Sequence, residues 1–111
     1  LYKKILVEGQ GELPQQGQEV FALYEGSLTN GDVFDSNQSR ESPFNFGLGQ
    51  GSVIKGWDQG FATMKKGEKA ILQIGPDFGY GKSGSGKIPA NATLIFEVEL
   101  LDFKDKKKEK W

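Results

Sequence analysis

The sequence predicts an α+β fold in which about five antiparallel strands wrap around one short helix. The main observation is that short segments with alternating apolar residues recur along the chain, which is typical of strands with one buried face. In addition, one segment carries apolar residues at the three- and four-residue spacing of an amphipathic helix. Since that helix must bury its apolar stripe, we expect a twisted sheet to cover it.

The composition excludes several classes of function. The chain has 111 residues, no His, no Cys and a formal net charge of −1. This length suits one compact domain. Without His and Cys, disulfides, thiolate or imidazole metal sites, Ser-His-Asp triads and Cys nucleophiles are excluded. The near-neutral charge argues against a nucleic-acid-binding domain, and no apolar run reaches the roughly 18 residues of a membrane span.

The first strands are expected over residues 2–7 and 19–28, separated by a loop rich in Gly, Gln and Pro at residues 9–17. The second of these strands is followed by Asn30-Gly31. An Asn-Gly pair between β-prone segments indicates a hairpin, and the type I′ turn that it favours needs a positive φ at both central residues. We expect the return strand over residues 33–35.

The middle of the chain predicts a loop, a strand and the helix. Residues 37–43 are polar, and the alternating residues that follow place Phe44, Phe46 and Leu48 on one face of a strand. The helix is expected to begin at Ser52, which suits an N-cap, and to end at Lys65-Lys66-Gly67, where cations meet the negative end of the helix dipole. Its apolar stripe consists of Ile54, Trp57, Phe61 and Met64.

Two further strands are expected in the C-terminal half. Alternating apolar residues mark residues 70–74, and a longer alternating segment covers residues 92–103. Residues 75–91 between them form a long Gly-rich loop. Residues 79–84 match the letters G-x-G-x-x-G, but no helix-forming segment follows them, so no dinucleotide site is expected.

Residues 1–104 are expected to form one domain. Residues 105–111 are mostly charged, and we interpret them as a tail or a linker to a missing C-terminal region. The chain begins with Leu1 rather than Met, which favours an excised domain or a processed product.

Several short motifs occur in an order and at a spacing that resemble the FKBP family, the tacrolimus- and rapamycin-binding peptidyl-prolyl cis-trans isomerases. The resemblance covers residues 2 to 104 and is closest to the domain found in larger multidomain members, where helical repeat domains often follow. It implies an antiparallel half-barrel of five or six strands around a short helix, in agreement with the fold predicted above. The motifs are Phe34-Asp35-Ser36, Pro43-Phe44-x-Phe46, Val53-Ile54-x-Gly56-Trp57, Pro76-x-Phe78-x-Tyr80-Gly81 and Ile88-Pro89-x-Asn91-Ala92-Thr93-Leu94.

The resemblance also implies an apolar pocket for the prolyl ring. Trp57, at the start of the predicted helix, would form the floor of this pocket, and Phe44 would border it. The backbone N–H of Ile54 and the hydroxyl of Tyr80 would donate hydrogen bonds to carbonyls of the ligand. The pocket walls would be Tyr24, Phe34, Phe46, Val53, Ile54 and Phe96.

Polar and rim residues complete the implied site. Asp35 would face the reacting amide or a macrolide hydroxyl, Arg40 would orient Asp35 and Tyr24, and Ile88 would flank the entrance. The residues that the resemblance assigns to catalysis are Asp35, Tyr80, Trp57, Phe96 and Tyr24.

The implied function is isomerisation of X-Pro peptide bonds in client proteins, which assists folding, with tacrolimus and rapamycin as inhibitors. A phosphatase or a kinase is the class of partner expected for the drug complex. We expect a monomeric domain in the cytoplasm or nucleus, with no nucleic-acid or membrane partner, no cofactor and no metal.

Other interpretations stay open at this point. The chain could be a recognition domain of the same fold that binds a partner through the loop at residues 83–88, or a small β domain of another family that binds an apolar ligand. Plain core packing is the alternative for each aromatic residue, and a turn-stabilising carboxylate is the alternative for Asp35. The chain departs from the family pattern at Gly79, at the shortened loop of residues 83–86 and at Lys87, which puts rim contacts and ligand selectivity in question.

Overall fold

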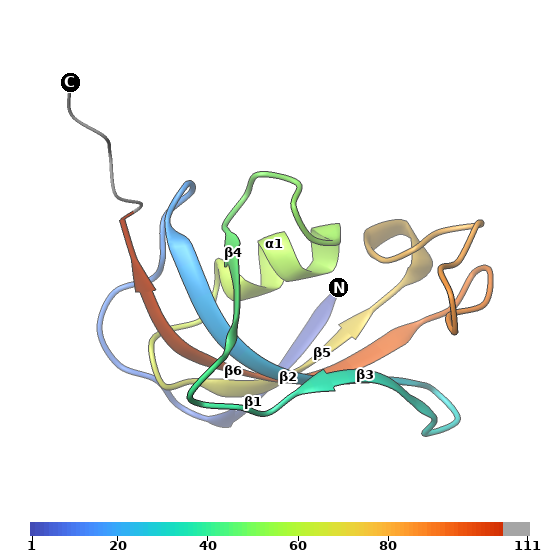
Figure 1. Ribbon diagram of the computed structural model, residues 1–111, viewed down its shortest axis with the longest axis horizontal. Coiled ribbons are helices and arrows are strands. Elements are labelled where there is room, and N and C mark those ends of the chain that lie inside the picture. The colour runs from blue at the N-terminus through green and yellow to red at the C-terminus, as the bar shows by residue number, and fades with distance from the viewer. Residues whose placement is uncertain (106–111) are drawn as a thin grey trace.

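The computed structural model describes residues 1–105, which form a six-stranded antiparallel sheet curved around one short helix (Figure 1). The predicted α+β class is therefore confirmed. The strands run in the order β1-β5-β6-β2-β3, and β4 pairs with the first residues of β2, on the same edge of β2 as β3. The elements are β1 Tyr2–Val7, β2 Glu19–Leu28, β3 Val33–Asn37, β4 Phe44–Gly47, α1 Lys55–Phe61, β5 Lys69–Ile74, the 3₁₀ turn η1 Pro76–Phe78 and β6 Leu94–Lys104.

The core lies between the concave face of the sheet and α1, which sits in the hollow of the curved sheet (Figure 1). Alternate residues of β5 and β6 are buried, as the sequence pattern predicts. The helix approaches β5 closely because it presents glycine there. A Cβ on Gly60 would lie 2.8 Å from Cδ1 of Leu72, and one on Gly56 would lie 2.6 Å from Cδ1 of Ile74.

The hairpin predicted at Asn30-Gly31 is present, but the predicted type I′ turn is wrong. Among the described residues Asn91 is the only non-glycine with a positive φ, so Asn30 does not adopt the left-handed conformation that this turn requires. Instead the Gly31 N–H donates to the carbonyl of Leu28 at 2.9 Å, and Gly31 itself takes a φ of 94°. The Asn30 side chain accepts from the N–H of Asp32 at 2.9 Å, which stabilises this wider turn.

The helix is shorter at both ends than the sequence predicts. Ile54, rather than Ser52, is the N-cap residue, and no side chain caps the helix. The helix ends at Phe61, ahead of the Lys-Lys-Gly segment. Met64 still reaches the core, fully buried, because tight turns with hydrogen bonds three residues apart continue past the end of the helix. The apolar spacing therefore identified the buried residues correctly and the helix end incorrectly.

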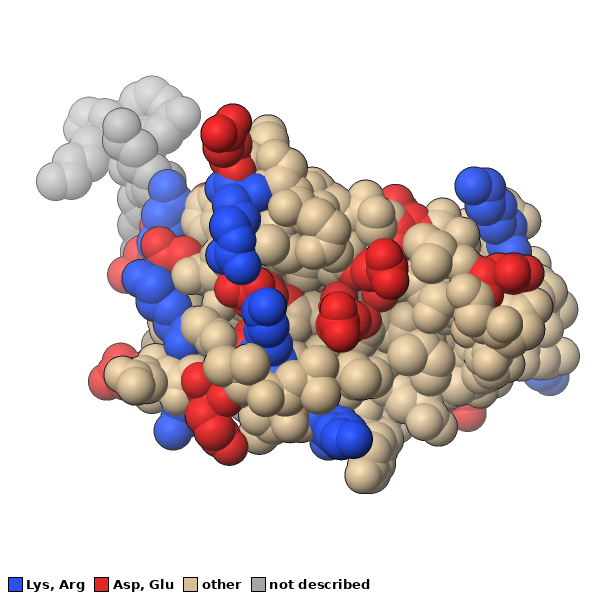
Figure 2. Space-filling model, turned by 90° about the horizontal axis from the view of Figure 1, so that it is seen from below, with Lys and Arg blue, Asp and Glu red and all other residues tan. Residues whose placement is uncertain are grey.

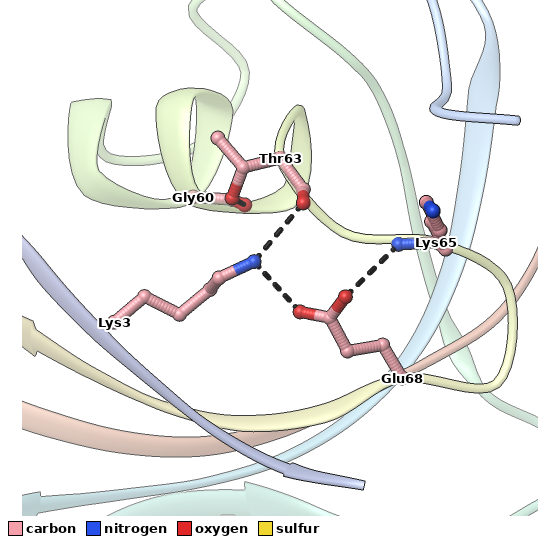
Figure 3. A network of polar contacts seen from close by, with 5 residues as sticks. All are labelled: Lys3, Gly60, Thr63, Lys65 and Glu68. Carbon is pink, nitrogen blue, oxygen red and sulfur yellow. Dashed lines mark hydrogen bonds and ion pairs between the residues drawn. The ribbon is translucent and has the colours of Figure 1, made fainter. Parts of the chain in front are cut away.

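The edge strand β1 is tied to the end of the helical segment by a buried ion pair (Figure 3). Lys3 donates from Nζ to Oε2 of Glu68 at 2.7 Å and to the carbonyl of Thr63 at 3.0 Å. The other carboxylate oxygen of Glu68 accepts from the N–H of Lys65 at 3.3 Å. Glu68 is the one buried charged residue in the described part of the chain, and its exposed fraction is 2%.

Replacing Lys3 with Met is expected to lower the free energy of unfolding by about 2 kcal/mol, because it leaves the Glu68 carboxylate buried without its cation. We expect less than the full 3–5 kcal/mol loss typical of a broken buried pair, since the Lys3 side chain is 19% exposed. Urea unfolding of the variant measures this difference. The matched control is Lys4→Met on the neighbouring exposed residue, which should change the midpoint little; equal midpoints for both variants would contradict the role of the pair.

Two further expectations concern the C-terminal segment and membrane-spanning helices. Residues 106–111 lie outside the described part of the chain, so the predicted boundary and the charged tail stay predictions. None of the helices within residues 1–105 is both long and apolar enough to cross a membrane.

Candidate active site

A cavity of ≈ 210 Å³ opens where the N-terminal end of α1 meets β2, β3, β6 and the long loop before β6. Its lining is mainly aromatic and aliphatic, with a few polar groups, which is the composition of a small-molecule or peptide site. Most of the predicted pocket residues come together here, although they lie far apart in the sequence. The lining residues are Tyr24, Phe34, Asp35, Phe44, Ser52, Val53, Ile54, Trp57, Tyr80 and Phe96.

Trp57 is at the centre of an aromatic cluster. Its side chain is buried, and the rings of Tyr24, Phe44 and Phe96 stand nearly perpendicular to it, with centroid distances of 5.0, 5.6 and 5.2 Å. Its Nε1 is the only buried side-chain polar atom of the described residues without a hydrogen-bond partner. Perpendicular ring pairs at such distances add favourable contacts beyond simple burial, so the cluster holds the indole in place although its N–H has no conventional acceptor.

Tyr24 and Asp35 form the polar corner of the cavity. The Tyr24 hydroxyl donates to Oδ2 of Asp35 at 2.8 Å. Burial, followed by the hydrogen bond to Asp35 and the nearby charge of that carboxylate, raises the pKa of Tyr24 to about 12. The hydroxyl is thus a donor throughout the physiological pH range, and it fixes the orientation of the carboxylate.

The raised pKa of Tyr24 predicts an alkaline loss of stability. Between pH 10 and about 12 the folded state keeps a proton that the unfolded chain has lost, so the free energy of unfolding falls as the pH rises, by about 3 kcal/mol in all. The Tyr24→Phe variant should not show this loss of unfolding free energy above pH 10. The Tyr2→Phe variant, which changes an exposed tyrosine, should show it as the wild type does. Urea unfolding at pH 9 to 12 compares the three proteins, and parallel curves for wild type and Tyr24→Phe would contradict the prediction.

The loop before α1 is held by a carboxylate of the helix. Asp58 accepts from the N–H groups of Gly49 and Gly51 at 2.9 and 3.1 Å. This interaction leads the chain into Val53 and Ile54 along the cavity wall. The carbonyl of Ile54 accepts from the N–H groups of Trp57 and Asp58, but within residues 1–105 its own N–H makes no hydrogen bond.

Tyr80 reaches the cavity from the long loop between η1 and β6, and it is 39% exposed. Backbone hydrogen bonds brace the loop on both sides of it. The Gly84 N–H donates to the Tyr80 carbonyl at 3.1 Å, and the N–H of Asn91 donates to the carbonyl of Gly81 at 2.8 Å. Ser85 and Ile88 exchange two further hydrogen bonds. The position of the Tyr80 hydroxyl therefore depends on the conformation of the whole loop.

The structure does not support the predicted role of Arg40. Its Nη2 pairs with Oε1 of Glu99 at 2.7 Å, and no contact joins it to Asp35 or Tyr24. Glu99 alternates with buried residues of β6, so this pair lies on the outer face of the sheet, where charges of both signs intermingle (Figure 2). Asp35 is oriented instead by Tyr24, whose own carbonyl accepts from the Gln38 side chain at 2.9 Å.

Two other predicted residues lie in the core rather than on the cavity surface. Phe46 is 6% exposed and packs behind Trp57 and Phe61, with centroid distances of 5.8 and 5.5 Å. Ile88 is 7% exposed and belongs to the same hydrophobic cluster. Both therefore support the residues that line the cavity.

Sequence reasoning missed two residues at the site. Ser52 lines the cavity, although we expected it only as a helix cap. Its position directly before Val53 could have indicated this. Gln38 holds the backbone of β2 beneath Tyr24, and nothing in the sequence distinguishes it from other polar loop residues.

A second, larger hollow of ≈ 620 Å³ lies on the other side of α1. Phe78 is the one aromatic residue in its lining, and the Asp58 carboxylate there is already engaged with the loop amides. Because the smaller cavity combines an aromatic wall with polar groups that face it, it is the better candidate for an active site.

Comparison with known proteins gives the same family as the motifs. Residues 10–101 match the family described as FKBP-type peptidyl-prolyl cis-trans isomerase. The chain is 58% identical over 101 residues to "FK506-binding protein 1" of Dictyostelium discoideum, covering 90% of this chain and 94% of that protein. It is 49% identical over 107 residues to a peptidyl-prolyl cis-trans isomerase of Schizosaccharomyces pombe, covering 95% and 96%.

Multidomain proteins also match. The chain is 51% identical over 104 residues to human "Peptidyl-prolyl cis-trans isomerase FKBP4", covering 92% of this chain but 23% of that protein. The family match and the two relatives that align over nearly their whole length indicate the same family, and the aromatic cavity is consistent with it. The chain therefore belongs to the FKBP family and is an FKBP-type peptidyl-prolyl cis-trans isomerase.

Proposed function

We propose that the aromatic cavity is the site at which this isomerase acts, with the prolyl ring of an X-Pro segment seated against Trp57. The observation that carries the proposal is the arrangement of Trp57, which lines the cavity with three rings nearly perpendicular to it and is itself only 4% exposed. A flat, buried indole gives an apolar ring a surface of fixed shape, and the size of the cavity suits one small ring with its adjoining peptide groups.

Such a site can catalyse without covalent chemistry. Rotation about an X-Pro bond has a barrier of about 18–20 kcal/mol, because the twisted amide loses its resonance. The twisted amide is also less polar than the planar one, so water stabilises the planar form more strongly. A largely apolar cavity removes that difference and favours the transition state. A rate increase of about 10⁴ requires only about 5.5 kcal/mol of such preference.

The polar groups of the cavity would fix the peptide around the bond that rotates. Ile54 and Tyr80 line the cavity, and the Ile54 N–H and the Tyr80 hydroxyl make no hydrogen bond within the described chain, so both would donate to carbonyls of the peptide. Asp35, held by Tyr24, would face the reacting amide or a hydroxyl of an inhibitor. Holding the flanking carbonyls while the central bond turns is a positioning effect.

The same cavity would bind tacrolimus and rapamycin. Support comes from the Dictyostelium discoideum relative, whose name states that it binds FK506. Most of a macrolide would remain outside a cavity of ≈ 210 Å³. The exposed part of the drug, with the loop of residues 83–88 beside it, would then form the surface that a phosphatase or kinase partner contacts. In the cell, X-Pro segments of folding client proteins in the cytoplasm would be the substrates.

The proposal is tested by measuring cis–trans exchange of an X-Leu-Pro-Phe peptide by NMR, with and without the protein and again with saturating tacrolimus. Accelerated exchange that the drug abolishes is the expected result. Acceleration that persists with the drug bound would place the reaction outside this cavity. No acceleration by folded protein would overturn the assignment of this cavity and favour a recognition role for the fold.

A further inference from the structure

Consecutive residues of β3, Phe34 and Asp35, both line the cavity. In a regular strand, neighbouring side chains point to opposite faces of the sheet, so this placement needs a local irregularity. The pairing of β2 with β3 provides it. Gly26 lies opposite Asp35 and Ser27 lies opposite Val33, so Phe34 has no partner on β2. This is a β-bulge, which re-aims a side chain of the bulged strand.

The residue opposite the bulge is Gly26, and it occupies a central position in the sheet. It is the register partner of Asp35 on β3 and of Phe96 on β6. Directly opposite residues share a face of the sheet, so a side chain at position 26 would point into the cavity between these two residues. Tyr24, two residues earlier on β2, shares that face and holds Asp35.

Two aromatic rings occupy the space that a side chain at position 26 would fill. A Cβ built on Gly26 would lie 2.6 Å from Cε1 of Phe96 and 2.7 Å from Cζ of Phe34. Apart from atoms of their own and the adjoining residues, real Cβ atoms essentially never lie within 3.0 Å of a heavy atom, so a single methyl group would displace a ring. The two rings also meet each other edge to face, with centroids 5.5 Å apart.

We propose that Gly26 is a positioning residue for the isomerase site. Its missing side chain lets the rings of Phe34 and Phe96 rest directly on the backbone of β2, and this contact sets how deep the cavity is beside Trp57. The inference rests on the proposed function of the cavity. Gly26 does not itself line the cavity and has no side chain that could take part in the reaction. Its proposed role is to leave space for the two rings that do line the cavity.

The test is Gly26→Ala in the peptide exchange assay. Displacement of the rings is expected to lower kcat/KM on the order of tenfold to 10²-fold, since misplacement of about 1 Å can have such an effect. Phe96 stands at 81° to Trp57 with centroids 5.2 Å apart, so its movement should also shift the indole N–H proton resonance of Trp57. A Trp111→Phe variant assigns that resonance, because the chain has two tryptophans.

A double-mutant cycle separates positioning from general damage to the sheet. If the methyl group acts by pushing the Phe34 ring, Gly26→Ala should have a much smaller effect when added to Phe34→Leu, which leaves room for it. Equal effects in both backgrounds, with no shift of the Trp57 resonance, would overturn the proposal.

The matched control is Gly60→Ala, whose methyl group would press on Leu72 in the core at a similar distance but away from the cavity. It should leave kcat/KM within about threefold of wild type. If wild-type protein itself fails to accelerate exchange, the proposed function fails. If wild-type protein is active and Gly26→Ala matches it in kcat/KM, only the role of Gly26 is overturned.

Discussion

Replacing Trp57 with Leu is expected to lower kcat/KM for an X-Leu-Pro-Phe peptide by about 10²-fold, while the protein remains folded at 25 °C. The substitution removes the flat surface against which the prolyl ring would lie. It also releases the perpendicular rings of Tyr24, Phe44 and Phe96, which would then close part of the cavity. A loss of this size corresponds to about 2.7 kcal/mol of transition-state stabilisation.

The free energy of unfolding must be measured together with activity. Replacing a buried aromatic residue with Ala lowers it by about 3–5 kcal/mol, and Leu lowers it less because its side chain fills part of the space. The matched control is Phe61→Leu. Phe61 is fully buried on the same helix and touches Trp57, with centroids 5.2 Å apart, but does not line the cavity. It should destabilise the protein with little effect on kcat/KM. Comparable activity losses in both variants would show that packing, rather than a prolyl surface, explains the result.

Replacing Gly84 with Ala is expected to lower kcat/KM at least about tenfold, mainly through a higher KM. Gly84 has a φ of 67°, and a Cβ there would clash with the carbonyl oxygen of Ile88 and lie 2.9 Å from the carbonyl carbon of Pro89. Backbone atoms of this kind cannot yield as a flexible side chain can. The loop must therefore rearrange, and Tyr80, whose carbonyl accepts from the Gly84 N–H, should move with it.

Gly86 provides a matched control in the same loop. It also has a positive φ, of 51°, but a Cβ there would meet no atom within 4 Å. Gly86→Ala should thus carry only the strain of a left-handed residue, about 1 kcal/mol, and keep most of the activity. Amide chemical shifts of residues 79–91 report the rearrangement directly. Equal kinetics for the two variants would mean that the position of Tyr80 does not depend on the Gly84 contact.

Strand positions could be predicted from the sequence with little error. The bounds of β1 and β2 agree with the predicted residues 2–7 and 19–28, because β-prone segments that end at residues typical of loops and turns mark them. Alternation did not identify β1, since none of its residues is buried. The buried face of β6 was also correct. The helix end and the turn at Asn30-Gly31 were wrong, since their form depends on hydrogen bonds that the local sequence does not specify.

The prediction of the site rested on other information than the prediction of the fold. Composition and spacing gave a set of aromatic residues and excluded catalysis by His or Cys, but only the resemblance to a family joined those residues into one pocket. Trp57 and Tyr24 lie in the cavity as implied, while Arg40 pairs with Glu99 on the opposite face of the sheet. A long, exposed arginine has several carboxylates within reach, and its choice depends on the three-dimensional arrangement of all of them.

The amino-acid sequence alone was enough to predict the order of the elements and the buried faces of α1, β5 and β6, because the spacing of apolar residues is a local property of the chain. Composition alone excluded His and Cys chemistry. The three-dimensional fold was needed to show that Phe34 and Asp35 line the same cavity, that Gly26 leaves room for two rings, and that Arg40 pairs with Glu99 instead. These features depend on register between strands that are distant in sequence. A shift of one residue in that register reverses the face on which every side chain of a strand lies.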